Sequence, residues 1–365
     1  MPCSPHASGR DHHTNDAVEM KKIWSRNYLM SSVLVLLGLS LWAIFPLQPD
    51  LITAAEKWKG VCWVGSRAPL MGPELEALKA TGADALSQTP FGWQSEKNNP
   101  VIRWDTHNEN KWWGESSVGI KATFDSSARH GIMNMLKPHL WVRGSWPGEI
   151  EMKSEEDWVV WFENYRAFIL DYAVMAEEHQ IPMLCVGTEL ELTSTREADW
   201  RKVIAAVREV YSGKLLYAAN FTEFEQVKFW DALDYLGIQA YFPLSTKANP
   251  SLSDLKLGWK KHLTKIEKLV RAYQKPVMFT EIGYCNTVDA AVEPWVWPNE
   301  RKEVELSEEM QALCYEAFFE TAWQKSWMAG VFFWKWYPEG KYRDPDFTPQ
   351  GKMAEQVMQK YFLMD

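Results

Sequence analysis

The sequence lacks the usual marks of disulfide-stabilised, nucleotide-binding and nucleic-acid-binding proteins. Its five cysteines form no CxxC pair and no metal-ligand spacing, so we predict neither a disulfide framework nor a metal site. No glycine-rich phosphate loop follows the first predicted strand, which argues against a nucleotide cofactor on a doubly wound sheet. The net charge of −9 argues against a nucleic-acid partner, because phosphate binding needs a basic face. We predict no cofactor.

Charged residues are also absent from residues 28–47, an apolar run long enough to cross a bilayer as a helix. Lys21, Lys22 and Arg26 precede it, and no A-x-A cleavage pattern follows. We therefore predict a polar cytoplasmic tail over residues 1–27 and a transmembrane or signal-anchor segment over 28–47. The rest of the chain would be exported and held at the periplasmic or extracellular face, or secreted if the segment is cleaved.

Eight short apolar runs follow, and they alternate with amphipathic helical patterns. The runs span residues 60–66, 83–93, 131–142, 181–190, 214–220, 235–244, 275–284 and 329–338. The helical patterns span residues 73–80, 154–179, 197–211, 255–274 and 307–325. Each run is apolar throughout its centre, as expected for parallel strands that are buried on both faces. This alternation predicts an α/β fold, a single (β/α)8 TIM barrel over residues 55–365.

Tryptophan is unusually abundant, with 21 residues. We expect most of them to fill the core and a few to offer a flat apolar face to a sugar ring. A long connection at residues 94–118, with no helical or strand period, carries Trp104, Asp105, His107, Trp112 and Trp113. We interpret it as a wall of a substrate cleft, because long loops of this kind are usually functional. An unstructured decoration is the alternative.

Glutamates stand where the fourth and seventh predicted strands end. Glu189 closes VGTE and Glu281 lies in FTEIGY. Side chains at the carboxyl ends of barrel strands form the active site in this fold, and strands four and seven face each other across the mouth. Two carboxylates placed in this way can act as the acid and the nucleophile, or the acid and the base, of glycoside hydrolysis. Either one alone could instead be part of a salt bridge in the barrel mouth.

Several strings resemble glycoside hydrolase family 113, a family of clan A typified by β-1,4-mannanases. They are MLKPHLWV, VGTEL, YAAN, GIQAYFPL, FTEIGY and FFWKW, and the similarity spans about residues 58–340. The resemblance implies a retaining enzyme that acts on a β-linked oligo- or polysaccharide, with Glu189 as acid/base and Glu281 as nucleophile. Thr188 stands where many clan members have asparagine, and the second strand ends without their arginine.

Further side chains at the strand ends are expected to support catalysis. Asn220 is our candidate for gripping the sugar 2-hydroxyl, and Tyr241 can donate a hydrogen bond to Glu281. The remaining predicted substrate-binding residues are Trp63, Trp93 and Trp334 for stacking, and Lys137 and His139 for hydroxyl groups. A structural ion pair beneath the site is an equal alternative for Lys137. Glu223 and Glu225 are expected to be solvated.

Three functions remain open from the sequence. The first is a retaining β-mannanase, and the second is a clan A glycosidase with another β-glycan substrate, because fold and acid pair do not determine the sugar. The third is a non-catalytic sugar-binding barrel. Metal-dependent hydrolysis is a weaker possibility, because the strand ends offer only His139 and no HxH motif.

Overall fold

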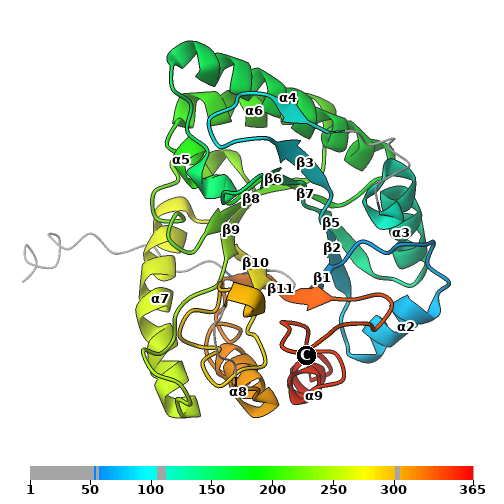
Figure 1. Cartoon of the computed structure of the whole chain (residues 1–365), viewed down its shortest axis with the longest axis vertical. Helices are drawn as coiled ribbons and strands as arrows, with labels where there is room; N and C mark the ends of the chain where they lie inside the picture. Colours follow the sequence, from blue (N-terminus) through cyan, green and yellow to red (C-terminus); the bar gives the residue numbers. More distant parts are fainter. Residues whose placement is uncertain (1–52, 55–56, 105–111, 301–304, 365) are drawn as a thin grey trace, which may run out of the picture. The chain divides into compact units, whose positions relative to one another are not determined.

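The computed structural model describes residues 53–54, 57–104, 112–300 and 305–364, and within them eight parallel strands close into a barrel (Figure 1). The strands are, in chain order, β1 (Trp58–Trp63), β2 (Ala85–Gln88), β5 (Met133–Leu136), β7 (Met183–Thr188), β8 (Lys214–Asn220), β9 (Tyr235–Gln239), β10 (Val277–Ile282) and β11 (Met328–Trp336). Each pairs in parallel with its neighbours, and β1 pairs with β11 to complete the ring. The prediction of eight barrel strands is confirmed.

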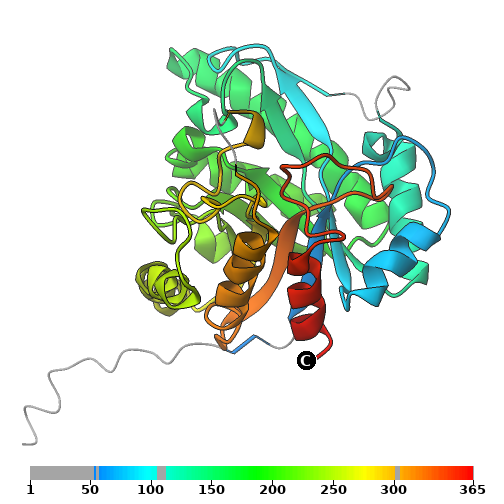
Figure 2. The same cartoon turned by 60° about the horizontal axis from the view of Figure 1, so that its bottom comes forward.

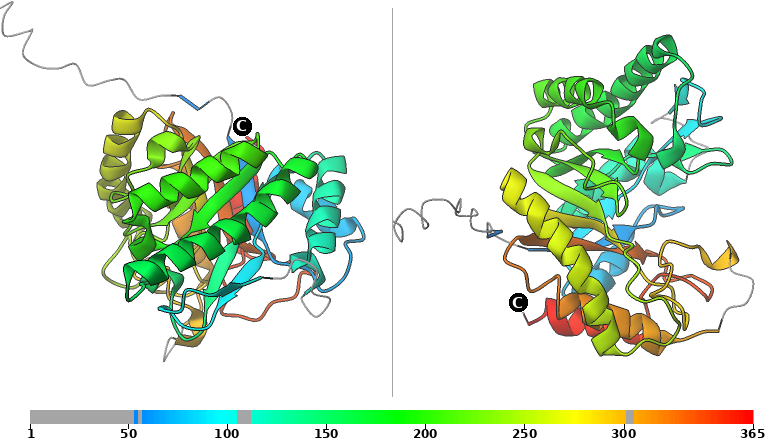
Figure 3. Two further views of the ribbon diagram at one scale, coloured as in Figure 1. Left: turned by 90° about the horizontal axis from the view of Figure 1, so that it is seen from above. Right: turned by 90° about the vertical axis from the view of Figure 1, so that its left-hand side faces the viewer.

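Helices surround the ring (Figures 1 and 3). They are α2 (Pro73–Ala80), α3 (Ser117–Arg129), α4 (Glu155–Glu178), α5 (Glu191–Ser194), α6 (Glu197–Val210), α7 (Leu252–Tyr273), α8 (Glu308–Phe319) and α9 (Met353–Phe362). The five predicted helices are confirmed as α2, α4, α6, α7 and α8, although α8 ends at Phe319 and not near residue 325. Helices α8 and α9 lie side by side (Figure 2). They pack through the stacked rings of Phe319 and Tyr361, whose centroids lie 4.5 Å apart.

Helix α4 shows how local sequence and packing combine. Ser154 caps its first turn by accepting a hydrogen bond from the backbone N–H of Asp157, and three acidic residues follow the cap. Trp161, Tyr165 and Phe168 recur at helical spacing and are buried against the barrel. Nine of the nineteen tryptophans in the described part of the chain are buried, so about half of them, and not most as predicted, fill the core.

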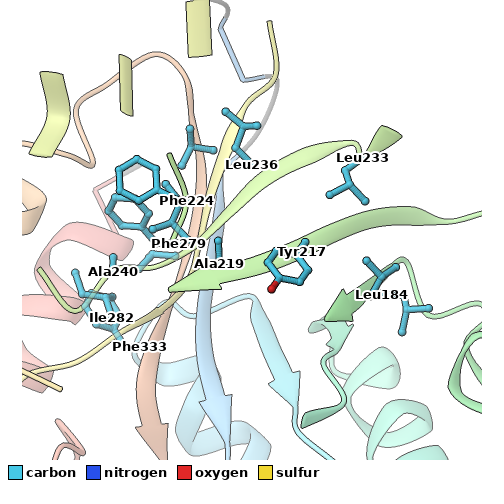
Figure 4. Close-up of a cluster of buried hydrophobic side chains, with 14 of the residues drawn as sticks. Leu184, Tyr217, Ala219, Phe224, Leu233, Leu236, Ala240, Phe279, Ile282 and Phe333 are labelled. Atoms are coloured by element: carbon cyan, nitrogen blue, oxygen red, sulfur yellow. The ribbon is translucent and has the colours of Figure 1, made fainter. Parts of the chain in front are cut away.

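The core has two layers because the side chains of each barrel strand alternate between the two faces of the sheet. Met135, Met183, Leu216 and Met278 belong to the smaller cluster inside the barrel. The larger cluster lies between the strands and the helices, and Figure 4 shows part of it, including Leu184, Tyr217, Leu236, Phe279 and Phe333. The rigid strands therefore hold the residues at their carboxyl ends in fixed positions.

A second, three-stranded sheet extends from two of the barrel strands. Its strands are β3 (Phe91–Gln94), β4 (Ile102–Arg103) and β6 (His139–Val142), in the order β4–β3–β6. We predicted one strand over 83–93 and one over 131–142, but each run contains a barrel strand and a strand of this second sheet. Pro90 and Pro138 separate the two parts, because proline cannot donate a hydrogen bond to a strand ladder.

The connection at residues 94–118 is more regular than predicted. It includes the end of β3, strand β4, a short 3-10 helix (Trp113–Glu115) and the start of α3. Trp104 donates a hydrogen bond to Asp171 of α4 at 2.6 Å, so this ring packs on a helix and is not part of a free cleft wall. Asp105 and His107 lie outside the described residues. The low helix propensity of the Val, Thr and Ser residues in α3 explains why it was missed.

The predicted tail and anchor segment, residues 1–27 and 28–47, lie outside the described residues. Within the ranges that the structure describes, no helix is long and apolar enough to cross a membrane. Cys62, Cys185, Cys285 and Cys314 are buried, and none of them forms a disulfide within the described residues. The described part of the chain therefore folds as a barrel without disulfide support.

Candidate active site

Glu189 stands immediately after β7, in a left-handed backbone conformation with φ of 52°. Such a conformation is unfavourable for a residue with a side chain and often marks a functional position. Its backbone N–H donates to the carbonyl of Ala218 at 2.9 Å, which ties the turn to β8. Its carboxylate accepts hydrogen bonds from Asn220 Nδ2 at 2.8 Å and from Trp146 Nε1 at 3.1 Å. Glu189 is therefore held at the mouth by β8 and by the turn after β6.

Glu281 lies on β10 and is only 4% exposed. Lys137, which follows β5, forms an ion pair with it, with Nζ 2.5 Å from Oε1. Tyr241, which follows β9, donates its phenolic hydrogen bond to Oε2 at 2.8 Å, as the sequence predicted. Lys137 also donates to the carbonyl of Thr280 at 3.0 Å. Both oxygens of Glu281 are thus hydrogen-bonded, which fixes the rotamer of this carboxylate.

The two carboxylates have opposite pKa shifts. Burial, and then the negative charge of Glu281, raise the pKa of Glu189 to about 7. Burial acts against ionisation of Glu281 as well, but the positive charge of Lys137 outweighs it and lowers the pKa of Glu281 below its usual range. Near neutral pH one group is therefore available as an acid while the other is ionised. Two carboxyl groups whose environments separate their pKa values in this way are typical of an acid and nucleophile pair.

Lys137 keeps its charge in spite of its complete burial. Burial lowers the pKa of a lysine, but here the negative charge of Glu281 helps to raise it. Cys62 is also close to Nζ, but burial raises the pKa of this thiol far above neutrality and keeps it uncharged. Lys137 is 0% exposed, so the predicted contact with a sugar hydroxyl does not fit the structure. The ion pair beneath the site, which the sequence left open, is what the structure contains.

Two other predicted residues occupy positions that differ from expectation, although the predicted stacking of Trp93 on a sugar stays a prediction. Trp63, the last residue of β1, is only 3% exposed because it belongs to the cluster between the strands and the helices, so it has no free face for stacking on a sugar. Trp93 is 47% exposed, but it stands on β3 of the second sheet and not at the end of a barrel strand. Because the run over 83–93 had been read as one strand, the sequence could not place Trp93 on a second sheet.

His139 lies beside Glu281, and Trp334 lies near the end of β11; their predicted contacts with a sugar stay predictions. The Nε2 atom of His139 is 3.7 Å from Oε1 of Glu281. Burial and the charge of Lys137 lower the pKa of His139 to about 3, so its ring is neutral and can donate or accept a hydrogen bond to a hydroxyl. Trp334 is half-buried near the end of β11, where its ring makes an edge contact with Trp297 at 6.3 Å, and the Trp334–Lys335 peptide bond is cis.

A buried network behind Glu189 was not predicted. Glu223, which we expected to be solvated, is 0% exposed. It accepts hydrogen bonds from the Tyr217 hydroxyl at 2.5 Å and from the backbone N–H of Asn220 at 2.9 Å. The Tyr217 hydroxyl in turn accepts from the backbone N–H of Leu190 at 3.1 Å. Glu223 therefore holds the backbone of Asn220 directly and, through the Tyr217 hydroxyl, the backbone of Leu190, which follows Glu189.

Trp146 was also missed, because no strand-end pattern marks it. It lies in the turn after β6, and its ring packs so closely on Gly148 that a Cβ there would stand 2.2 Å from it. Glycine at this position is the only signal in the sequence, since it permits the ring to lie against the backbone. The outcome is an indole N–H aimed at Glu189.

Comparisons with known proteins agree with this geometry. The model of Glycoside Hydrolase Family 113 matches residues 65–352. Among curated proteins, no match was found. A solved structure of the GH113 β-mannanase AaManA from Alicyclobacillus acidocaldarius, in complex with ManMIm, is 26% identical, with a TM-score of 0.74 over 86% of this chain and 98% of that one.

Two further structures show how far the similarity extends. A complex of a GH113 β-1,4-mannanase is 25% identical, with a TM-score of 0.73 over 85% of this chain and 100% of that one. The Faecalibacterium prausnitzii β-glucuronidase is 12% identical, with a TM-score of 0.54 over 85% of this chain and 49% of that one, and shows a shared fold alone.

Proposed function

Because the chain belongs to glycoside hydrolase family 113, we propose that it hydrolyses β-1,4-mannan with retention of configuration, through Glu189 as acid/base and Glu281 as nucleophile. The observation that carries the proposal is the contrast between the two carboxylates. Lys137 and Tyr241 keep Glu281 ionised, while Glu189 has a pKa of about 7. This is the division of roles that a double displacement requires.

In the first step, Glu281 attacks the anomeric carbon while Glu189 protonates the departing glycosidic oxygen. The bond from the anomeric carbon to that oxygen breaks, and a covalent bond to a carboxylate oxygen of Glu281 forms. As negative charge leaves Glu281, its ion pair with Lys137 weakens. Loss of its negative charge also removes one of the causes of the raised pKa of Glu189.

In the second step, Glu189 acts as a base. Its pKa is lower while Glu281 is esterified, because a neutral ester no longer repels the second carboxylate. Glu189 removes a proton from water, which attacks the anomeric carbon and releases Glu281 as a carboxylate. The sugar product thus keeps its configuration, and both residues return to their starting states.

The choice of mannan rests on the two similar structures that are described as mannanases. A screen of the protein against mannan, glucomannan, xylan and cellulose for new reducing ends tests this choice. We expect the fastest release from mannan or glucomannan. Faster release from xylan or cellulose would assign another β-glycan, and no release from any of them would favour a non-catalytic sugar-binding barrel.

Glu189→Ala is expected to reduce hydrolysis of mannan by about 10²–10⁴-fold, the usual contribution of a general acid. An aryl β-mannoside with a good leaving group needs little protonation, so its first step should be much less affected.

The pH profile of activity provides a second check on the role of Glu189. Wild-type activity should fall as the pH rises through about 7, because Glu189 loses its proton there. That decline should disappear for the aryl substrate in Glu189→Ala, and its persistence would assign the acid to another residue.

We also propose that residues 28–47 anchor the enzyme in a membrane with the barrel outside the cytoplasm. The proposal rests on the uncharged run and the basic residues before it. Separation of membranes from soluble material, followed by protease treatment of intact cells, tests it. Recovery of the full chain in the soluble cytoplasm would contradict it.

A further inference from the structure

The two faces of the second sheet have different surroundings. On the face toward α4, Gln94 accepts a hydrogen bond from the indole of Trp161 at 3.0 Å, and Ile102 and Val142 are buried. On the opposite face, Trp93 is 47% exposed and Trp141 is 54% exposed. A sheet with one covered face normally presents polar side chains on the other. Two exposed tryptophans in this position therefore need an explanation other than packing.

The exposed side chains form a row across the three strands. Trp93 is the register partner of Trp141 on β6 and of the exposed Arg103 on β4, so all three project from the same face. The rings of Trp93 and Trp141 lie 6.0 Å apart between centroids, with their planes inclined by 51°. The row thus combines two flat apolar faces with a guanidinium group that can donate hydrogen bonds.

This row is continuous with the candidate active site. Phe91 and His139 form the next row of the same face as register partners. Phe91 lies 5.5 Å from His139 and 6.4 Å from Trp141 between ring centroids. His139 in turn lies 3.7 Å from the Glu281 carboxylate. An unbroken series of aromatic rings therefore leads from the nucleophile outward to the exposed indoles.

The chemistry of the row suits a sugar chain. An exposed apolar patch on a soluble protein marks a binding surface, and indole rings match the C–H face of a pyranose. Arginine at the end of the row can bind hydroxyl groups without requiring a charged ligand. The two outer rings lie two strand residues beyond Phe91 and His139, about 7 Å farther from the reacting carbon. That distance is beyond the sugar that reacts and within reach of its neighbours in the chain.

We propose that Trp93, Trp141 and Arg103 form a platform that binds sugar residues of the substrate outside the one that reacts. This inference rests on the proposed function, because it takes the ligand to be a β-1,4-linked mannan chain. The platform selects long substrates over short ones, since only a chain that extends from the reaction centre reaches it. The alternative occupant of this face is a second copy of this protein, and the experiments below distinguish the two.

Binding of β-1,4-mannohexaose, measured by calorimetry, tests the platform apart from catalysis. We would use Glu189→Gln as the parent, so that the ligand survives the titration. Adding Trp93→Ala or Trp141→Ala should weaken binding by about tenfold each, the factor expected when a tryptophan face loses its contact with an apolar surface. Trp58→Ala, which removes an aromatic ring from β1 at the amino-terminal end of the barrel, should leave the affinity unchanged.

The kinetics of the variants in the otherwise wild-type chain provide a second measurement. The double variant Trp93→Ala/Trp141→Ala should lose at least about tenfold more kcat/KM on mannan than on an aryl β-mannoside. Equal losses on both substrates, together with unchanged hexaose binding, would overturn the platform. The face would be assigned to self-association instead if the wild type is a dimer, Trp93→Ala/Trp141→Ala is a monomer, and both bind the sugar equally well. If hexaose binding needs both rings but the wild-type chain does not hydrolyse mannan, the platform stands and the proposed function is rejected.

Discussion

Glu281→Ala is expected to reduce kcat on β-mannan by about 10⁴-fold or more, a loss of the size seen when other hydrolases lose their nucleophile. The substitution removes the group that forms the covalent intermediate, and no described residue stands ready to replace it. Unlike Glu189→Ala, the variant should be equally inactive on an aryl β-mannoside, because a good leaving group does not substitute for a nucleophile. Release of aryl alcohol and of reducing sugar measures the two losses.

Azide distinguishes the roles of the two carboxylates. In Glu281→Ala, azide can enter the space of the lost side chain and attack an activated β-mannoside from that face, giving an α-mannosyl azide. In Glu189→Ala, azide attacks the intermediate on Glu281 from the opposite face and gives the β-azide. Glu225→Ala is a matched control, because this surface glutamate forms an ion pair with Lys265 and lies outside the proposed mechanism. Glu225→Ala should behave as the wild type does. A β-azide from Glu281→Ala and an α-azide from Glu189→Ala would mean that the two glutamates have the opposite roles.

Lys137→Met is expected to affect both activity and stability. It removes the positive charge 2.5 Å from Glu281 while keeping a long side chain in the buried space. Loss of one partner from a buried ion pair costs about 3–5 kcal/mol of folding free energy, because the other charge is left uncompensated. The pKa of Glu281 should rise, since Lys137 is the group that lowers it against the effect of burial. Urea unfolding and the pH profile of kcat/KM measure the two effects.

The direction of each pH effect follows from the lowered pKa of Glu281. Glu281 has a lowered pKa in the folded protein, so its ion pair contributes stability at neutral pH and loses it as the pH falls through that pKa. In Lys137→Met this contribution disappears, and the acid limb of the activity profile should move to higher pH because the nucleophile is protonated sooner. An unchanged acid limb would show that Lys137 does not keep Glu281 ionised.

Two variants separate the charge of Lys137 from its contribution to packing. Lys275→Met alters a half-buried lysine that precedes β10 and bonds the carbonyl of Leu233, at the end of the strand away from Glu281. It should lower stability at most modestly and leave the acid limb in place. The double variant Lys137→Met/Glu281→Leu removes both charges, so it should recover most of the lost stability but no activity. A double variant as unstable as Lys137→Met would mean that shape, and not charge, determines the cost.

The barrel strands were predictable because burial on both faces leaves a continuous apolar run. The fourth run, which contains β7, and the seventh, which contains β10, are examples. Those runs also placed Glu189 and Glu281, since a polar residue at the end of such a run must lie at the barrel mouth. Tyr241 was predictable for the same reason, and it does bond Glu281. The second sheet was not predictable, because its strands continue the apolar runs of β2 and β5 beyond a single proline.

Residues that act through three-dimensional contacts were also beyond the sequence. Trp146 reaches Glu189 from a turn with no periodic pattern, and its ring is held there by close packing on Gly148. Glu223 looked solvated because Thr222, Glu225 and Gln226 near it in the chain are polar, yet the Tyr217 hydroxyl and a backbone N–H satisfy it in the interior. Burial of a charged group depends on partners that are distant in sequence, and a single chain does not disclose them.

The central claim is that Glu281 forms a covalent bond with the sugar, and mass spectrometry of the trapped intermediate tests it most directly. A 2-deoxy-2-fluoro-β-mannoside with a good leaving group should react, because fluorine slows the second step and the intermediate accumulates. After digestion, we predict that the added mass of one fluorosugar lies on Glu281 in the FTEIGY peptide, and that Glu281→Ala carries none. A label on another carboxylate, or rapid turnover of the fluorosugar to product of inverted configuration, would contradict the account.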